Sequence, residues 1–118
     1  MLIKILVVDD SPTDRLIIKN TLCEYCILTA GDGAEAMRML EENDGINLLI
    51  LDLNMPYKSG FQVLEALKED EHFRKLRTII LTDYNDLADE SKGLKLGAVD
   101  YIRKPLHPDA LKTRIDVH

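Results

Sequence analysis

Short hydrophobic runs alternate with segments of helical periodicity along the whole chain. The runs are rich in Ile, Leu and Val, and residues 48–51 are four aliphatic residues in a row. Uninterrupted aliphatic runs bounded by turn residues are typical of parallel strands that are buried on both faces. The pattern predicts strands over residues 3–8, 25–30, 47–52, 78–82 and 99–102.

Helix signals occupy the intervals between these runs. Ser11, Pro12 and Asp14 combine a cap, a first-turn proline and an acidic third position, which favours a helix to about residue 23. Further helices are expected after the glycine turn 31–33, after residues 59–60, over about 86–96 and from residue 108. Strands that alternate with helices through short loops predict an α/β domain whose parallel sheet has helices on both faces.

Length, composition and charge narrow the class of protein. The 118 residues are 46% hydrophobic and 31% charged, which is ordinary for one soluble globular domain over residues 1–118. The net charge of -6 gives no electrostatic support to a nucleic-acid-binding surface. No apolar stretch approaches the ~20 residues of a membrane span and no signal-peptide layout is seen, so a cytoplasmic location is expected. The short last helix favours a domain cut from a longer chain, and a small stand-alone protein is the alternative.

Cys23 and Cys26 have the spacing of a thioredoxin-like redox pair. Such a pair needs its first cysteine at a helix N-terminus, where the helix dipole lowers the pKa of the thiol. These two cysteines instead fall between the end of a helix and the next strand, and the sequence has no second cysteine pair or His cluster for a zinc site. We therefore expect both thiols to be reduced and buried.

Polar residues stand where the predicted strands end. Asp9 and Asp10 follow the first strand and Asp52 ends the third, while Thr82 ends the fourth and Lys104 follows the fifth. Right-handed crossovers bring these ends to one edge, where open α/β sheets bind their ligands. Three carboxylates at that edge would repel one another unless a cation neutralised them, and oxygen ligands without His or Cys suit Mg²⁺.

This set of side chains has what phosphoryl transfer to a carboxylate requires. Asp52 would be the nucleophile, and Mg²⁺ and Lys104 would offset charge on the phosphoryl oxygens. Thr82 would donate a hydrogen bond to the attached group. Each residue alone has a simpler interpretation: acidic residues before a helix, a hydroxyl bonded to backbone, or a solvated lysine. Their joint placement at the ends of the first, third, fourth and fifth strands favours a site.

In this order and spacing, the residues give the chain a resemblance to the receiver domain of two-component response regulators, over residues 2 to about 117. The resemblance implies a flavodoxin-like three-layer α/β sandwich of five βα units, with the parallel strand order 2-1-3-4-5. Each motif is weak alone, and the combination is specific. The motifs are Asp9-Asp10, Asp52 with Met55-Pro56 and Gly60, Leu81-Thr82, Gly97-Ala98 with Asp100-Tyr101, and Lys104-Pro105.

The resemblance also implies a phosphoacceptor chemistry. Asp52 would accept a phosphoryl group from a phosphohistidine on a sensor histidine kinase. The chain would then be a signalling domain, with at most slow autophosphorylation from phosphodonors and slow self-hydrolysis, and not an enzyme. A Mg²⁺ (or Mn²⁺) ion would be held by the side chains of Asp10 and Asp52. Asp9 would contribute directly or through water, and Asn54 through its backbone carbonyl.

A switch pair is implied at Thr82 and Tyr101. Thr82 would move toward the phosphoryl group and Tyr101 would rotate inward, because the added charge favours one of two states. A partly exposed aromatic at a sheet edge is the alternative for Tyr101. The expected partner is an output domain or another protein, with a possible homodimer through the fourth helix, fifth strand and last helix. Four residues there are candidates for charge pairs or for a solvated face: Lys95, Asp100, Arg103 and Arg114.

Two positions depart from the common pattern of the family. The residue after Thr82 is usually small, but here it is Asp83, which either repels an anionic donor or points to solvent. Tyr84 stands where the family tunes the attack of water on the aspartyl phosphate, and a bulky ring there would lengthen its lifetime. Tyr57 and Lys58 occupy variable positions that we relate to partner choice.

Other functions are less well supported by the sequence. A Mg²⁺-dependent phosphatase with an aspartyl nucleophile would need an acid two residues after Asp52, where Asn54 cannot donate a proton. A receiver fold kept only for interactions would not require the complete set of site residues. Nucleotide binding is also less well supported, because Gly31 and Gly33 follow the second predicted strand and do not have the G-x-G-x-x-G spacing of a dinucleotide-binding loop.

Overall fold

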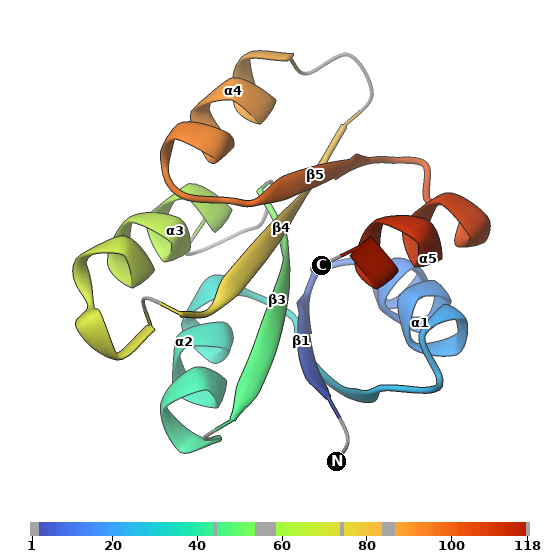
Figure 1. Ribbon diagram of the computed structural model, residues 1–118, viewed down its shortest axis with the longest axis horizontal. Coiled ribbons are helices and arrows are strands. Elements are labelled where there is room, and N and C mark those ends of the chain that lie inside the picture. Colours follow the sequence, from blue (N-terminus) through green and yellow to red (C-terminus); the bar gives the residue numbers. More distant parts are fainter. Residues whose placement is uncertain (1–2, 44, 54–58, 74, 84–86, 118) are drawn as a thin grey trace.

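The computed structural model is a five-stranded parallel sheet between two layers of helices (Figure 1). It describes residues 3–43, 45–53, 59–73, 75–83 and 87–117. The strand order is 2-1-3-4-5, as the resemblance implied. The strands are β1 (Lys4–Val8), β2 (Cys26–Ala30), β3 (Ile46–Asp52), β4 (Arg77–Thr82) and β5 (Asp100–Arg103).

Helices cover both faces of the sheet (Figure 1). α1 and α5 lie side by side on one face, and α2, α3 and α4 lie on the opposite face. A short 3₁₀ helix, η1 (Glu71–Phe73), joins α3 to β4 and was not expected from the sequence. The bounds are α1 (Pro12–Thr21), α2 (Gly33–Glu42), α3 (Gly60–Glu69), α4 (Leu87–Lys95) and α5 (Pro108–Val117).

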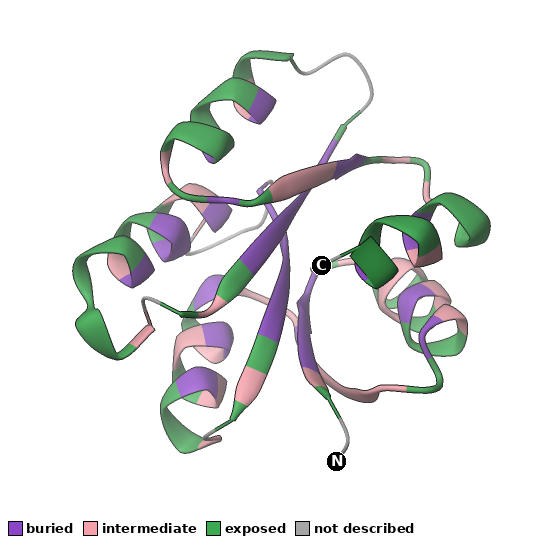
Figure 2. Ribbon diagram, in the orientation of Figure 1, coloured by how far each residue is buried: buried purple, intermediate pink, exposed green. Residues whose placement is uncertain are grey.

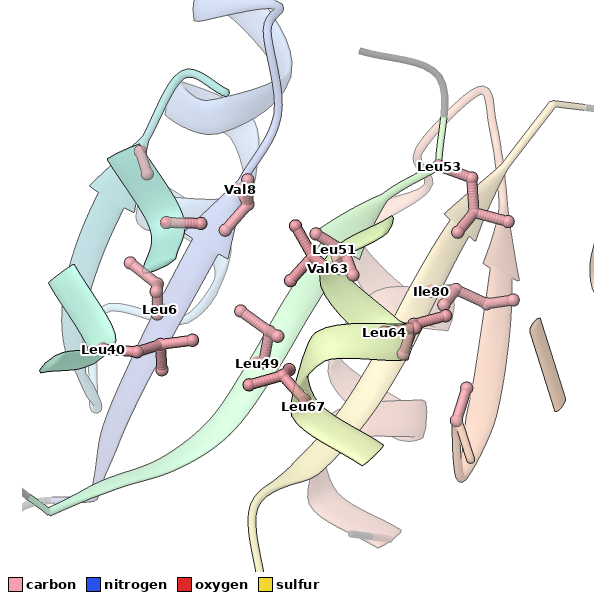
Figure 3. Packing of buried hydrophobic residues seen from close by; sticks show 13 residues of the cluster. Leu6, Val8, Leu40, Leu49, Leu51, Leu53, Val63, Leu64, Leu67 and Ile80 are labelled. Carbon is pink, nitrogen blue, oxygen red and sulfur yellow. The ribbon is translucent and has the colours of Figure 1, made fainter. Parts of the chain in front are cut away.

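Alternation along the strands divides the hydrophobic core into two halves. Successive strand residues point to opposite faces, so Leu49 and Leu51 pack toward α2 and α3, whereas Leu48 and Ile50 pack toward α1 and α5. Figure 2 shows β1, β3 and β4 as mostly buried. Figure 3 shows the half of the core that packs against α2 and α3, with Leu64 among its residues. The aliphatic run is therefore uninterrupted because both of its faces are covered.

The helix starts follow the signals in the sequence. Ser11 caps α1, with its side chain accepting a hydrogen bond from the N–H of Asp14. Asp32 caps α2 in the same way, and Ser59 and Gln62 form a reciprocal capping box at the start of α3. These caps fix where α1 and α3 begin, and both helices begin beside the strand ends that carry the candidate residues.

Two glycines let helices approach the sheet unusually closely. A Cβ on Gly60 would lie 2.4 Å from the carbonyl oxygen of Asp52, so the start of α3 is pressed against the end of β3. A Cβ on Gly93 would lie 2.3 Å from Cδ1 of Ile80, so α4 rests directly on β4. Neither position has room for a side chain without movement of its neighbours.

The prediction that both cysteines are buried is wrong. Both Cys23 and Cys26 are free thiols. Cys23 is exposed and Cys26 is half-buried, because α1 ends at Thr21 and Leu22 takes the buried position in the turn that follows. The helices of the described segments lack the length and the hydrophobicity that a bilayer-spanning helix needs.

Candidate functional site

Three carboxylates meet at the carboxyl edge of the sheet. Asp9 directly follows β1, Asp10 comes next, and Asp52 is the last residue of β3, the strand that pairs with β1. One oxygen from each residue lies within 4.8 Å of the others. Asp9 and Asp52 are buried, and Asp10 is exposed. The structure thus brings together the three residues that the sequence placed at this edge.

Backbone contacts hold Asp9 in a fixed orientation. Its N–H donates to the carbonyl of Ala30 on the neighbouring strand, at 3.1 Å. Its Oδ1 accepts a hydrogen bond of 2.9 Å from the N–H of Ser11, at the start of α1. Its Oδ2 is fully buried and has no hydrogen-bond partner of good geometry in the described part of the chain, although an ammonium group lies 3.0 Å away. This oxygen is therefore compensated by the charge of the ammonium group and not by a well-formed hydrogen bond.

That ammonium group belongs to Lys104, which follows β5. Its Nζ lies 3.0 Å from Asp9 Oδ2, 2.9 Å from Asp14 Oδ2 and 3.1 Å from Asp52 Oδ2. Burial alone would lower the pKa of Lys104, but the adjacent carboxylates of Asp14, Asp9 and Asp52 raise it well above its ordinary value. The lysine is therefore charged over the whole physiological range, and it is not the solvated surface residue considered as the alternative.

Asp14 belongs to this charge cluster, a role that the sequence did not reveal. The pattern explained Asp14 as an acidic residue in the first turn of α1, and the capping geometry confirms that role. Its carboxylate also faces Lys104, because α1 begins directly behind Asp9 and Asp10. One signal was available: an acidic residue in the first turn of the helix that follows the acidic pair lies near the same edge of the sheet.

The donor set at this edge fits a small divalent cation. The ligands available are carboxylate oxygens without His or Cys, which suit Mg²⁺ or Mn²⁺. The buried Oδ2 of Asp9 supports this fit, because it lacks a well-formed hydrogen bond among the described residues and such a buried acceptor is costly. Asn54, expected to contribute its carbonyl, lies outside the described residues, as do the loop residues Tyr57 and Lys58.

Thr82 ends β4 with its hydroxyl directed toward α4. The residue is buried, and its Oγ1 donates to Oε2 of Glu90 at 3.3 Å. Glu90 is also buried and accepts two hydrogen bonds from Arg103, of 2.7 and 3.0 Å. This contact was not predicted from the sequence, because α4 has few apolar residues and its pattern is that of a solvated helix. The weak signal available was Gly93, which stands one turn later on the same helix face.

Tyr101 lies half-buried on β5 beneath two guanidinium groups. The Cζ atoms of Arg103 and Arg114 are 5.3 and 5.8 Å from the centre of its ring. Arg114 also pairs with Asp100, with Nη1 2.9 Å from both carboxylate oxygens. Asp100, Arg103 and Arg114 are thus paired within the chain. Asp83 is exposed, and Tyr84 lies outside the described residues.

Known proteins resemble this chain in sequence and in fold. Residues 5–116 match the family described as the response regulator receiver domain. The chemotaxis protein CheY1 of Helicobacter pylori is 38% identical over 117 residues, which cover 97% of this chain and 94% of that protein. A probable cyclic di-GMP phosphodiesterase of Vibrio cholerae is 37% identical over 115 residues, which cover 97% of this chain and 26% of that protein.

Solved structures agree with the sequence relatives. The chemotaxis protein CheY4 of Vibrio cholerae superposes with a TM-score of 0.90 at 28% identity, over 99% of this chain and 98% of that one. A two-component response regulator with a GGDEF domain superposes with a TM-score of 0.91 at 29% identity, over 98% of this chain and 48% of that one. The chain therefore belongs to the family of response regulator receiver domains.

Proposed function

We propose that this receiver domain accepts a phosphoryl group on Asp52, in a Mg²⁺-dependent transfer from a phosphohistidine of a sensor histidine kinase. The observation that carries the proposal is the position of Asp52 at the end of β3. There its Oδ2 lies 3.1 Å from Lys104 Nζ and beside the carboxylates of Asp9 and Asp10. A nucleophilic carboxylate needs nearby positive charge to meet a phosphoryl group, and Lys104 supplies it.

The transfer is a single displacement at phosphorus. An oxygen of Asp52 forms the new P–O bond while the P–N bond of the donor breaks, and the electron pair leaves with the imidazole nitrogen. Lys104 offsets the charge on the phosphoryl oxygens. Asp9 is held in place by its hydrogen bonds with the N–H of Ser11 and the carbonyl of Ala30. Bound Mg²⁺, held by Asp9, Asp10, Asp52 and the carbonyl of Asn54, would supply further positive charge beside the transferred group.

The phosphorylated state is proposed to differ from the resting state at Thr82 and Tyr101. The added group carries about -1.5 to -2 charges and three acceptor oxygens, so it competes for the hydroxyl proton of Thr82. Movement of Thr82 would leave space for Tyr101, whose ring now lies under Arg103 and Arg114. The change would then reach the surface formed by α4, β5 and α5.

We further propose that this surface transmits the signal to an output domain or a partner protein, with dimerisation as one possible route. The names of the relatives support more than one kind of output, since one is a chemotaxis protein and another is a probable cyclic di-GMP phosphodiesterase of greater length. The choice of kinase and output is proposed to depend on residues outside the acidic site.

The direct test is treatment with a small acyl phosphate and Mg²⁺, followed by intact-mass measurement. A single phosphoryl adduct is expected, and it should be absent in Asp52→Asn and in wild type treated with a chelator. The matched control is Asp109→Asn, which removes an exposed carboxylate on α5 and should leave the adduct unchanged. An adduct that persists in Asp52→Asn would overturn the assignment.

A further inference from the structure

The buried carboxylate of Glu90 has no part in the chemistry described so far. α4 is largely exposed (Figure 2), and its buried residues are Glu90 and Gly93. Glu90 retains only 4% of its accessible surface. A buried carboxylate is costly unless hydrogen bonds and an opposite charge compensate it. The burial of Glu90 therefore depends on the groups that bind its carboxylate.

Two strand residues compensate this carboxylate. Nε of Arg103 donates to Oε2 at 2.7 Å, and Nη2 donates to Oε1 at 3.0 Å, in a bidentate pair. Thr82 adds a third hydrogen bond to Oε2 at 3.3 Å. Thr82 and Arg103 are partners in the β4–β5 register, so both side chains point to the face that α4 covers. The absent side chain of Gly93 allows α4 to come close enough for these contacts.

The hydroxyl of Thr82 has one proton to donate. While that proton is given to Glu90, it is not available to a phosphoryl group on Asp52. We propose that Glu90 is a positioning residue that holds the Thr82 hydroxyl on the α4 side until the phosphoryl group competes for it. This inference rests on the proposed phosphoacceptor role of Asp52, and it adds a residue and a contact that set how readily the switch responds.

Arg103 makes the exchange a balanced one. When the hydroxyl leaves, Glu90 retains both hydrogen bonds from the guanidinium, so the buried carboxylate is not left as an unpaired charge. The exchange therefore replaces one hydrogen bond of Thr82 by another. The guanidinium of Arg103 also lies 5.3 Å from the centre of the Tyr101 ring. A shift of the Arg103–Glu90 pair would therefore change the surroundings of Tyr101, the second expected switch residue.

The experiment measures the affinity of the protein for fluoroberyllate with Mg²⁺, an analogue of a phosphoryl group on a carboxylate, by calorimetric titration. Glu90→Met has a similar length and no comparable acceptor, so it frees the hydroxyl and should tighten binding about three- to ten-fold, the value of one hydrogen bond. Glu90→Gln is the matched control, because it also removes the charge but keeps an acceptor for Thr82. Its affinity should stay near that of wild type.

The Thr82→Ala background separates positioning from simple loss of charge. Without the hydroxyl, the Met and Gln variants should bind fluoroberyllate with equal affinity. Equal tightening by Met and Gln in the wild-type background would overturn the inference, because the cause would then be the charge. A difference between Met and Gln that persists in Thr82→Ala would overturn it as well.

Failure of this inference can be told apart from failure of the proposed function. If wild type does not bind fluoroberyllate, the phosphoacceptor role of Asp52 falls, and this inference falls with it. If wild type binds and the variants behave alike, only the inference falls. Should Glu90→Met not fold, carbon NMR of wild type decides: fluoroberyllate should shift both the Glu90 carboxyl and the Thr82 methyl signals. An unchanged Glu90 signal would overturn the inference.

Discussion

Lys104 places one ammonium group among the carboxylates of Asp9, Asp14 and Asp52. At the scale of residues, electrostatics dominates the site, since the three carboxylates lie within about one hydrogen-bond length of the same ammonium group. The lysine acts as a tethered counter-ion in the absence of a metal ion. Its flexible stem lets it follow a carboxylate or a phosphoryl oxygen without backbone movement.

Replacing Lys104 with Met should lower the free energy of unfolding by about 1–3 kcal/mol at pH 7 without Mg²⁺, because the carboxylates lose their partner. The pKa of Lys104 is raised in the folded state, so its contribution is fully present below the ordinary value of 10.5. It is lost as pH rises through the higher folded value. Urea unfolding should therefore show a constant difference between wild type and variant from about pH 7 to 9, narrowing above about pH 10.5.

The control for this series is Lys112→Met, which removes a lysine paired with Glu24 on the exposed surface of α5. Exposed pairs of this kind contribute little to stability. A Lys104→Met protein as stable as the Lys112→Met protein would show that the buried cluster does not depend on its lysine.

At the scale of elements, the start of α3 is the most constrained contact with the site. Gly60→Ala would bring a methyl group to 2.4 Å from the Asp52 carbonyl and 2.7 Å from the Leu53 Cα, and backbone atoms cannot rotate away. We expect a loss of about 1–3 kcal/mol in unfolding free energy, as for other overpacked sites, and slower formation of the Asp52 adduct. Urea unfolding and the mass assay measure the two effects.

Gly31→Ala is the matched substitution for this test. Its added methyl group would meet its nearest atom, Nη1 of Arg15, at an ordinary contact distance of 3.5 Å. Stability within about 0.5 kcal/mol of wild type is expected. If Gly60→Ala proved equally neutral, the close approach of α3 to β3 would have no energetic importance.

Regular elements were predictable because each was specified locally. The aliphatic runs, the Ser11 cap, the Ser59-Gly60 pair and the glycine turn placed every strand and the starts of α1 to α3, with boundaries correct to within one or two residues. The acidic residues at the strand ends were predictable for the same reason, since strand direction alone brings them together. The sheet order came from the resemblance of the whole motif set.

The contacts across elements were not predictable in this way. Glu90 belongs to a helix with few apolar residues, and its burial follows from Arg103, thirteen positions later, and from Thr82 on a third element. Asp14 likewise faces Lys104 only once the sheet has formed. The prediction that Cys23 is buried failed, because a free cysteine in a turn has no periodic pattern that would fix the direction of its side chain. Pairings between distant residues leave no local trace in sequence.

At the scale of the whole molecule, the net charge of -6 is concentrated in part at one edge of the sheet. Mg²⁺ that binds the folded state should therefore stabilise the protein by about 2.7 kcal/mol at a hundredfold excess over its dissociation constant. Thermal unfolding should show this as a rise in Tm of several degrees. NaCl at the same ionic strength is the control for general screening.

Asp10→Asn should remove most of this Mg²⁺-dependent rise, because it takes away one of the three carboxylates without opening the core. Two results would argue against a cation site at this edge. One is an equal rise with NaCl, and the other is a full Mg²⁺ effect in Asp10→Asn.

The close packing of α4 on β4 through Gly93 has a consequence for how such a switch is tuned. A side chain at position 93 would meet Cδ1 of Ile80, so the glycine allows helix and strand to approach, and that approach affects how firmly Glu90 holds Thr82. On the proposed role of Glu90, the threshold for responding to phosphorylation is thus fixed by a residue that has no functional group. Sensitivity could be adjusted at position 93 while every acidic, basic and hydroxyl residue of the site stayed the same.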